Sequence, residues 1–164
     1  MQDKKHQEHE FEPFYTQNSR ILILGSFPSV KSREQQFYYG HPQNRFWKVL
    51  SGLQMEPVPK TLEEKKQFLT RHHIALWDVI ESCDISGSSD SSITNVVPTN
   101  LRLLIEKSEI RFIYTNGALA GKLYRKYQGE QIQLPMISLP STSPANAAYS
   151  IERLLSEWKQ TTEC

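Results

Sequence analysis

Hydrophobic residues in this chain of 164 residues fall into short blocks separated by polar stretches. The block from Ile21 to Leu24 ends at Gly25, which is typical of a short buried strand that enters a tight turn. Similar runs predict three more strands, at residues 74–80, 110–115 and 134–139. Residues 1–12 are charged and aperiodic and predict a frayed lead-in, whereas the serine-rich stretch 83–95 predicts a surface loop.

Helical periodicity alternates with these strands. Apolar residues recur at i, i+3, i+4 and i+7 in two segments, at Phe46, Val49, Leu50 and Leu53 and again at Ile151, Leu154, Leu155 and Trp158. Thr61 and Glu64 form a capping box that opens a helix ending near residue 71. Two further helices are expected at residues 101–107 and 118–127.

Strands that alternate with helices predict an α/β fold, a three-layer α/β/α sandwich with a mainly parallel four-stranded central sheet. We expect a single domain over residues 1–164. Ligands of such sheets bind beyond the carboxyl ends of the strands. This rule selects four segments: GSFPS after the first strand, Trp77-Asp78 in the second, Asn116-Gly117 after the third and LPSTSPANA after the fourth.

Composition excludes several classes of protein. The apolar run from Ile21 to Leu24 is far shorter than the roughly 20 residues of a membrane helix. The charged N-terminus does not resemble a secretory signal, so we expect a cytoplasmic protein without a membrane partner. Cys83 and Cys164 are too few for a disulfide framework, a cysteine-rich zinc site or an iron–sulfur cluster, and the sequence predicts no metal.

The formal net charge is only +1, but basic residues gather near the predicted ligand end of the sheet. Residues 20–48 hold five basic side chains against Glu34 alone, namely Arg20, Lys31, Arg33, Arg45 and Lys48. A positive rim of this kind suits a phosphate backbone, although the same residues could be ordinary solvated side chains.

Two segments carry candidate chemistry, one before the first predicted long helix and one after the fourth strand. YYGHPQNRFW (residues 38–47) combines aromatic rings, which can stack on bases, with amides, which can bond a base edge or a water. LPSTSPANA (residues 139–147) places hydroxyls before a helix start, where they can hold a phosphate or simply cap the helix. GSFPS lacks the glycines of a phosphate-binding loop and is not a nucleophile elbow.

The three motifs, in this order, resemble those of the uracil-DNA glycosylase superfamily, most closely its hypoxanthine-DNA glycosylase branch. The resemblance covers residues 21–158, and GHPQNRFWKVL is its most specific part. The mismatch-specific uracil branch is similar in the HP-x-NRFWKV segment, so this stretch alone does not separate the two branches.

The resemblance implies roles for individual residues. Many relatives carry an Asn or Asp at the third position of the first motif to handle the attacking water, and Phe27 stands there in this chain. The hypoxanthine branch uses the Asn of the HP-x-N segment, which is Asn44 here. Tyr39 matches the aromatic residue that stacks on the extruded base, and Asp78 occupies the position of a base-reading Asn. The implied base-binding residues are Gly25, Ser26, Phe27, Tyr39, Asp78 and Asn116.

The last motif and the basic rim are implied to hold the DNA. Ser141 replaces a His of some relatives, and Ser143 matches a phosphate-contacting Ser. Pro144-Ala145 matches the wedge that fills the gap left by the base, with an alanine smaller than the leucine of some relatives. Together with Arg33, Arg45 and Lys48, which flank the predicted pocket, these residues form the expected DNA-binding set.

We therefore expect a monofunctional DNA glycosylase, a monomer without a cofactor, that flips a deaminated base out of DNA and hydrolyses its N-glycosidic bond. An ionised Asp78 would accept N1–H of hypoxanthine, a group that adenine lacks, unless Asp78 is a structural cap. The alternatives are a mismatch-specific uracil glycosylase, a non-catalytic DNA-damage binder, a small-nucleotide hydrolase, and a lyase that uses Lys31 or Lys48 as the nucleophile.

Overall fold

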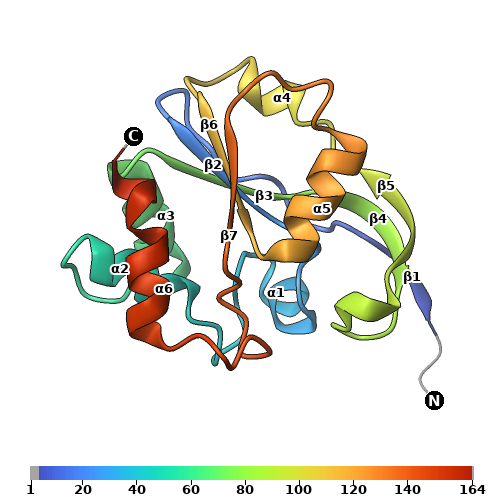
Figure 1. Ribbon diagram of the computed structural model, residues 1–164, viewed down its shortest axis with the longest axis horizontal. Helices are drawn as coiled ribbons and strands as arrows, with labels where there is room; N and C mark the ends of the chain where they lie inside the picture. The colour runs from blue at the N-terminus through green and yellow to red at the C-terminus, as the bar shows by residue number, and fades with distance from the viewer. Residues whose placement is uncertain (1–3, 164) are drawn as a thin grey trace.

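A computed structural model describes residues 4–163 and contains a four-stranded parallel sheet at its centre (Figure 1). The strands are β2 (Ile21–Gly25), β3 (Ile74–Asp78), β6 (Phe112–Asn116) and β7 (Met136–Leu139), and their order is β3-β2-β6-β7. All three pairings are parallel. Every residue of β2 and β3 is buried, as expected for aliphatic strands covered on both faces. The predicted α/β fold with a parallel four-stranded sheet is confirmed.

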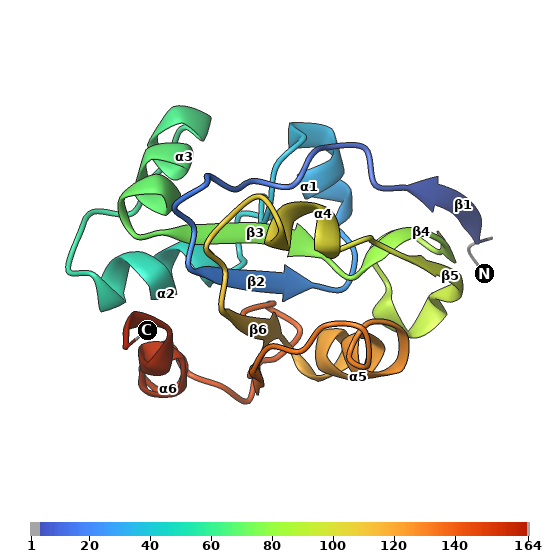
Figure 2. The ribbon, with the colours of Figure 1, turned by 90° about the horizontal axis from the view of Figure 1, so that it is seen from above.

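Helices cover the sheet on both sides. In Figures 1 and 2, α2 (Phe46–Leu53), α3 (Leu62–Arg71) and α6 (Ile151–Trp158) lie on one side of it and α5 (Ala118–Tyr127) lies on the other. Thr61 caps α3 by accepting a hydrogen bond from the Glu64 amide, as the capping box predicted. Two shorter α-helices are α1 (Val30–Gln35) and α4 (Arg102–Ile105), and 3₁₀ turns occupy Asp90–Ser92 and Lys159–Thr162.

A second, antiparallel sheet corrects two of our predictions. It has the order β1-β4-β5 and consists of β1 (Lys5–Glu8), β4 (Ile80–Ile85) and β5 (Thr94–Pro98). The predicted lead-in is therefore wrong over residues 5–8, because β1 pairs with β4, and residues 1–3 lie outside the described residues. The predicted loop at 83–95 is also wrong at both ends, which belong to β4 and β5.

The predicted strand at residues 74–80 divides at Val79. Residues up to Asp78 pair with β2 in the parallel sheet, and from Ile80 the chain enters the antiparallel sheet. The Val79 amide donates to the Gly25 carbonyl at 2.8 Å, and the Val79 carbonyl accepts from the Thr99 amide at 2.8 Å. The crossing between the two sheets thus lies directly beside Asp78.

The antiparallel sheet creates a small core of its own. Phe27 is 8 % exposed and packs with Ile80, Cys83 and Ile85 in a cluster separate from the main core. The ring of Phe27 is therefore held by an antiparallel sheet that the sequence analysis did not predict. None of the helices within residues 4–163 is both long and apolar enough to cross a membrane.

Candidate active site

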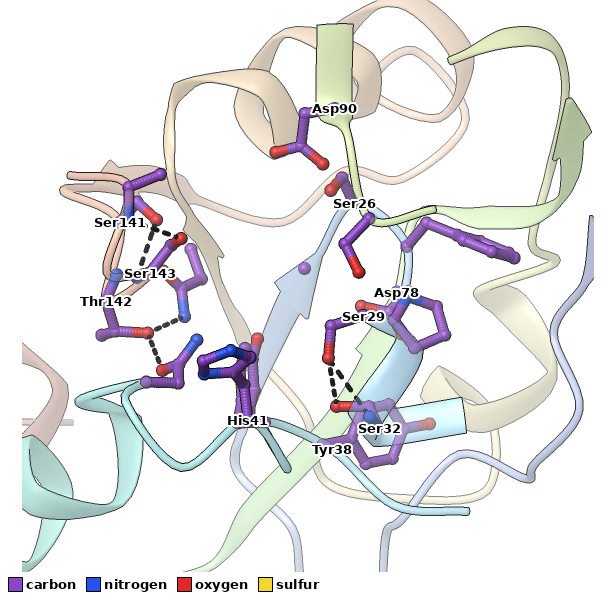
Figure 3. Close-up of a pocket in the computed structure, with 18 of the residues that line it drawn as sticks. Ser26, Ser29, Ser32, Tyr38, His41, Asp78, Asp90, Ser141, Thr142 and Ser143 are labelled. Atoms are coloured by element: carbon purple, nitrogen blue, oxygen red, sulfur yellow. Dashed lines mark hydrogen bonds between the residues drawn. The ribbon is translucent and has the colours of Figure 1, made fainter. Parts of the chain in front are cut away.

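A pocket of about 320 Å³ opens at the carboxyl ends of β2, β3 and β6. In the sheet, β2 lies between β3, which follows it in the chain, and β6, so the order of the strands reverses direction at β2. Open parallel sheets bind ligands beyond the strand ends at such a position, and the pocket lies there. Figure 3 shows Ser141, Thr142 and Ser143 on one wall, with Ser26, Ser29 and Asp78 on the other. The predicted residues that line it are Gly25, Ser26, Phe27, Tyr39, Asn44, Asp78, Asn116, Ser141, Ser143, Pro144 and Ala145.

Asp78 forms part of the pocket wall at the end of β3. Its side chain is only 5 % exposed, and a Cβ atom on Gly25 would stand 2.5 Å from Asp78 Oδ1. A glycine at position 25 therefore allows the carboxylate to approach the β2 backbone, which explains why β2 ends on this residue. The other carboxylate oxygen, Oδ2, lies 2.8 Å from Nε2 of His9.

His9 reaches this position from the N-terminal segment that follows β1. Its side chain is 1 % exposed, and Nδ1 lies 2.8 Å from the Phe11 carbonyl oxygen. Burial acts to lower the pKa of His9, but hydrogen bonding with Asp78 and the charge of that carboxylate outweigh burial, so the pKa is raised. His9 and Asp78 are 69 residues apart in the sequence, and no local pattern could have predicted their contact.

Asn44 lies at one end of a chain of hydrogen bonds whose direction is determined. Its Oδ1 accepts from the Phe46 amide at 2.9 Å, and since a backbone N–H can only donate, the orientation of the Asn44 amide is settled. Thr142 Oγ1 therefore donates to the same Oδ1 at 2.8 Å. Thr142 in turn accepts from Asn116 Nδ2 at 3.0 Å, while the Thr142 amide donates to Asn116 Oδ1 at 3.0 Å.

This chain determines what Asn44 can offer a ligand. Both lone pairs of its Oδ1 are already used by Phe46 and Thr142, so the group left for the pocket is the Nδ2 amide, a donor. We predicted that Asn116 binds the base, but its side-chain carbonyl and one N–H are hydrogen-bonded to Thr142. The sequence analysis did not single out Thr142, although it lies between Ser141 and Ser143 in a predicted motif.

Tyr39 occupies an uncommon backbone conformation beside the pocket. Its φ is 55°, in the left-handed region that non-glycine residues seldom adopt, and such residues gather at functional sites. One face of its ring stacks on Phe46, with centroids 3.9 Å apart, and a Cβ on Gly25 would stand 3.2 Å from its hydroxyl. Burial raises the pKa of Tyr39 and the charge of Asp78 adds to the rise, so the hydroxyl stays neutral, and it has no hydrogen-bond partner among the described residues.

Asp90 is a second carboxylate at the pocket that the sequence analysis missed. It lies in the 3₁₀ turn of the serine-rich segment, and in Figure 3 it stands beyond Ser26. Desolvation raises its pKa, hydrogen bonding with Ser26 acts in the opposite direction, and the charge of Asp78 adds to the rise. His41 also lines the pocket, and its Nδ1 accepts from the Gln43 amide at 3.1 Å.

The loop of residues 139–147 is held in place by Arg45. The guanidinium donates to the carbonyl oxygens of Ser143 and Asn146, both at 3.0 Å, and to that of Tyr149. Within the loop the hydroxyl oxygens of Ser141 and Ser143 accept from backbone amides. Arg45 thus supports the loop that carries the predicted DNA contacts, and a direct contact between Arg45 and phosphate stays a prediction.

The two other predicted basic contacts differ in their surroundings. Arg33 lies with its guanidinium carbon 5.5 Å from the centre of the Phe27 ring and donates to the Gly87 carbonyl at 2.8 Å. Lys48 is exposed on α2. Neither residue lines the pocket itself. Residues 4–163 contain no group of three or more His, Cys, Asp or Glu side chains placed to hold a metal ion.

Comparisons with known proteins agree with this geometry. The family model of the uracil DNA glycosylase superfamily matches residues 12–161. A protein of Methanosarcina acetivorans named hypoxanthine DNA glycosylase is 36 % identical over 91 % of this chain and 94 % of its own length. A protein of the same name from Methanosarcina barkeri is 31 % identical over 68 % of this chain and 72 % of its own length.

A solved structure is similar as well. The solution NMR structure of a candidate uracil DNA glycosylase from Methanosarcina acetivorans has a TM-score of 0.79 and 34 % sequence identity. It covers 93 % of this chain, and this chain covers 95 % of it.

Proposed function

The chain belongs to the uracil DNA glycosylase superfamily, and from this premise we propose that it releases hypoxanthine from DNA by hydrolysing the N-glycosidic bond. The observation that carries the choice of base is Asp78, whose buried carboxylate lies at the pocket wall with Oδ1 against Gly25. The two relatives named hypoxanthine DNA glycosylase support the same choice.

Asp78 would distinguish hypoxanthine from adenine by the direction of one hydrogen bond. A base inside a duplex is inaccessible, so the nucleotide must first flip into the pocket. There Oδ1 of Asp78 can accept N1–H of hypoxanthine, whereas N1 of adenine is itself an acceptor. Facing a bare acceptor leaves a buried carboxylate unpaired, which costs about 1–3 kcal/mol or more.

Asn44 would hold the attacking water through its Nδ2 group. Because its Oδ1 is already saturated, the amide donates to the water oxygen and accepts no proton from it. Its contribution is therefore to place the water for attack on C1′, where positive charge develops as the bond breaks. The leaving base gains negative charge, which the neutral hydroxyl of Tyr39 and the backbone of Gly25 and Ser26 are placed to stabilise.

Uracil release is the second candidate function. The similar solved structure is named as a candidate uracil DNA glycosylase, and uracil also offers an N–H, at N3, that Asp78 can accept. Phe27 argues against this candidate, because its buried ring occupies the position where many relatives carry an acid or amide for the water. A DNA-damage binder without catalysis is the non-enzymatic alternative.

Base release from matched duplexes tests the proposal. The duplexes carry one inosine, uracil or adenine at the same position, and single-turnover rates are measured with excess protein. We expect inosine to be cleaved fastest and Asn44→Ala to lower that rate by roughly 10²-fold with little change in DNA affinity. Gln43→Ala, an exposed neighbour, serves as the matched control.

Each alternative has its own outcome in this assay. Faster release of uracil than of inosine would assign the chain to the uracil-specific reaction. Binding without release of any base would leave the damage-binding function. Normal cleavage by a folded Asn44→Ala protein would remove Asn44 from the mechanism. A monomeric state, a cytoplasmic location and independence of cofactors stay predictions.

A further inference from the structure

The two hydrogen bonds of the His9 ring, to the Phe11 carbonyl and to Asp78, require two protons, and a neutral imidazole carries only one. The Phe11 carbonyl has no hydrogen to give, so Nδ1 of His9 carries the proton in their 2.8 Å contact. A neutral imidazole protonated at Nδ1 presents a lone pair at Nε2. Yet Nε2 lies 2.8 Å from Asp78 Oδ2, where two lone pairs would repel each other. A second proton must therefore lie between Nε2 and Oδ2.

We infer that His9 is a positioning residue for base choice, which holds this shared proton on the Oδ2 side of Asp78 so that Oδ1 meets the base only as an acceptor. The inference rests on the proposed role of Asp78. The inference holds whether the shared proton is on Nε2 of His9 or on Oδ2 of Asp78. An imidazolium beside a carboxylate and a neutral imidazole beside a carboxylic acid protonated at Oδ2 both leave Oδ1 without hydrogen.

Loss of His9 would change the hydrogen-bonding character of the pocket wall. Asp78 is 5 % exposed, and burial without a partner favours the protonated form of a carboxyl group. That proton would be free to sit on Oδ1, which would become a donor. A donor at Oδ1 pairs with N1 of adenine and opposes N1–H of hypoxanthine. His9 would thus protect the normal base as well as select the damaged one.

Burial among aromatic rings opposes protonation of His9, and the hydrogen bonds and charges near it outweigh that effect. The rings of Phe11, Phe27 and Tyr38 pack around His9, with centroids 4.6, 6.2 and 6.0 Å from its own. The charge of Glu81 on β4 acts with Asp78 to raise the pKa of His9. Tyr39 and Asp90 lie near Asp78, and Arg33 lies over the ring of Phe27. The charge of Glu12 acts on Tyr38, and the cavity beside His9 is also lined by Glu10, Tyr15 and Lys107.

Substitutions at His9 in the full chain test the inference by base choice. His9→Leu removes both N–H groups, whereas His9→Gln keeps a donor for Asp78 without a titratable proton. We expect His9→Leu to release inosine at least about 10-fold more slowly and to lower the ratio of inosine to adenine release by a similar factor. His9→Gln should retain more of both. His6→Gln, an exposed histidine of β1, is the matched control and should behave like the wild type.

The pH profile separates a shared proton from a merely structural role. Because the pKa of His9 is raised, its proton is lost at a higher pH than that of an ordinary histidine, on the alkaline side of the profile. We expect inosine release by the wild type to fall on this alkaline side, because a deprotonated Nε2 repels Oδ2. His9→Gln should lack this decline. The inference would be overturned if folded His9→Leu and His9→Gln both had the same rates, base ratios and pH profiles as the wild type.

Histidine NMR in the free protein keeps this test independent of the proposed function. We expect both ring nitrogens of His9 to carry protons at neutral pH, and Asp78→Asn to lower the pKa of His9. An identical titration of His9 in the wild type and Asp78→Asn would overturn the shared proton, even where His9→Leu fails to fold. A wild type that releases no hypoxanthine but shows this coupling would refute the proposed substrate and leave the pair intact.

Discussion

Single hydrogen-bond directions decide what the residues of this pocket can do. Asn44 was expected from the sequence to orient water, and an isolated amide could do so as a donor or as an acceptor. The backbone N–H of Phe46 and the hydroxyl of Thr142 take both lone pairs of Oδ1, so only the donor remains. Thr142 is itself oriented by Asn116, which makes these three residues one unit.

Thr142→Val is expected to disturb catalysis by removing the hydroxyl while keeping the side chain's shape. Asn44 Oδ1 would lose one donor and Asn116 Nδ2 its acceptor, at a cost of about 1–3 kcal/mol in stability. We expect inosine release to fall about 10-fold, with Thr142→Ser close to the wild type. Single-turnover rates and thermal melting measure both effects. Thr70→Val on exposed α3 is the control, and equal effects at positions 70 and 142 would contradict the role of Thr142.

Secondary-structure elements bring the acid to the pocket at the crossing between the two sheets. β3 ends at Asp78, and two residues later β4 begins to pair with β1 and β5. The same antiparallel sheet carries His9 toward Asp78, since the His9 amide donates to the Glu81 carbonyl at 2.7 Å. The end of β2 must in turn leave room for the carboxylate, which is the function of Gly25.

Gly25→Ala is expected to displace Asp78 without replacing any charged side chain. The added Cβ would stand 2.5 Å from Asp78 Oδ1, so the carboxylate or the strand must move. Overpacking of this kind typically costs about 1–3 kcal/mol, and we expect a lower melting temperature together with a large loss of inosine release. Gly52→Ala, where the Cβ meets only the end of Leu155, is the control. Normal release by Gly25→Ala would show that the position of Asp78 is unimportant.

At the scale of the whole molecule, charge distribution matters more than net charge. The total of +1 would not by itself attract a polyanion. Lys48 is exposed and available to phosphate, whereas Arg33 contacts the Phe27 ring and the Gly87 carbonyl. Arg45 donates to three carbonyl oxygens within residues 143–149. These three cations therefore have different expected effects on DNA binding.

The salt dependence of DNA binding separates these cations. Each true phosphate contact releases counterions, so Lys48→Ala should lower the slope of log K against log salt by about one unit. Arg45→Ala should instead lower the melting temperature, because the loop loses its donors. Lys159→Ala, an exposed lysine in the 3₁₀ turn that follows α6 and outside the pocket lining, should leave the slope unchanged. Equal slopes in Lys48→Ala and the wild type would place the DNA on another face.

The sequence alone determined those features that depend on neighbouring residues. The aliphatic block of β2, the apolar face of α2 and the cap of α3 are local patterns, and each appears in the structure where it was predicted. The motifs also sufficed for the family, whose model matches residues 12–161. Residues of all four segments selected at the predicted strand ends line one pocket, because strand ends of a parallel sheet share one edge.

Only the tertiary structure decided the contacts between distant parts of the chain. β1 pairs with β4 across more than seventy residues, and its polar sequence carries no periodic signal. His9 and Asp78 are 69 residues apart, and Thr142 and Asn44 are 98 apart. A hydrogen bond needs two groups within about 3 Å, and whether distant residues meet this condition depends on the path of the whole backbone. The sequence therefore indicated which residue types occur at the pocket. Which atoms of those residues carry protons, and how the side chains are oriented, follow from the fold.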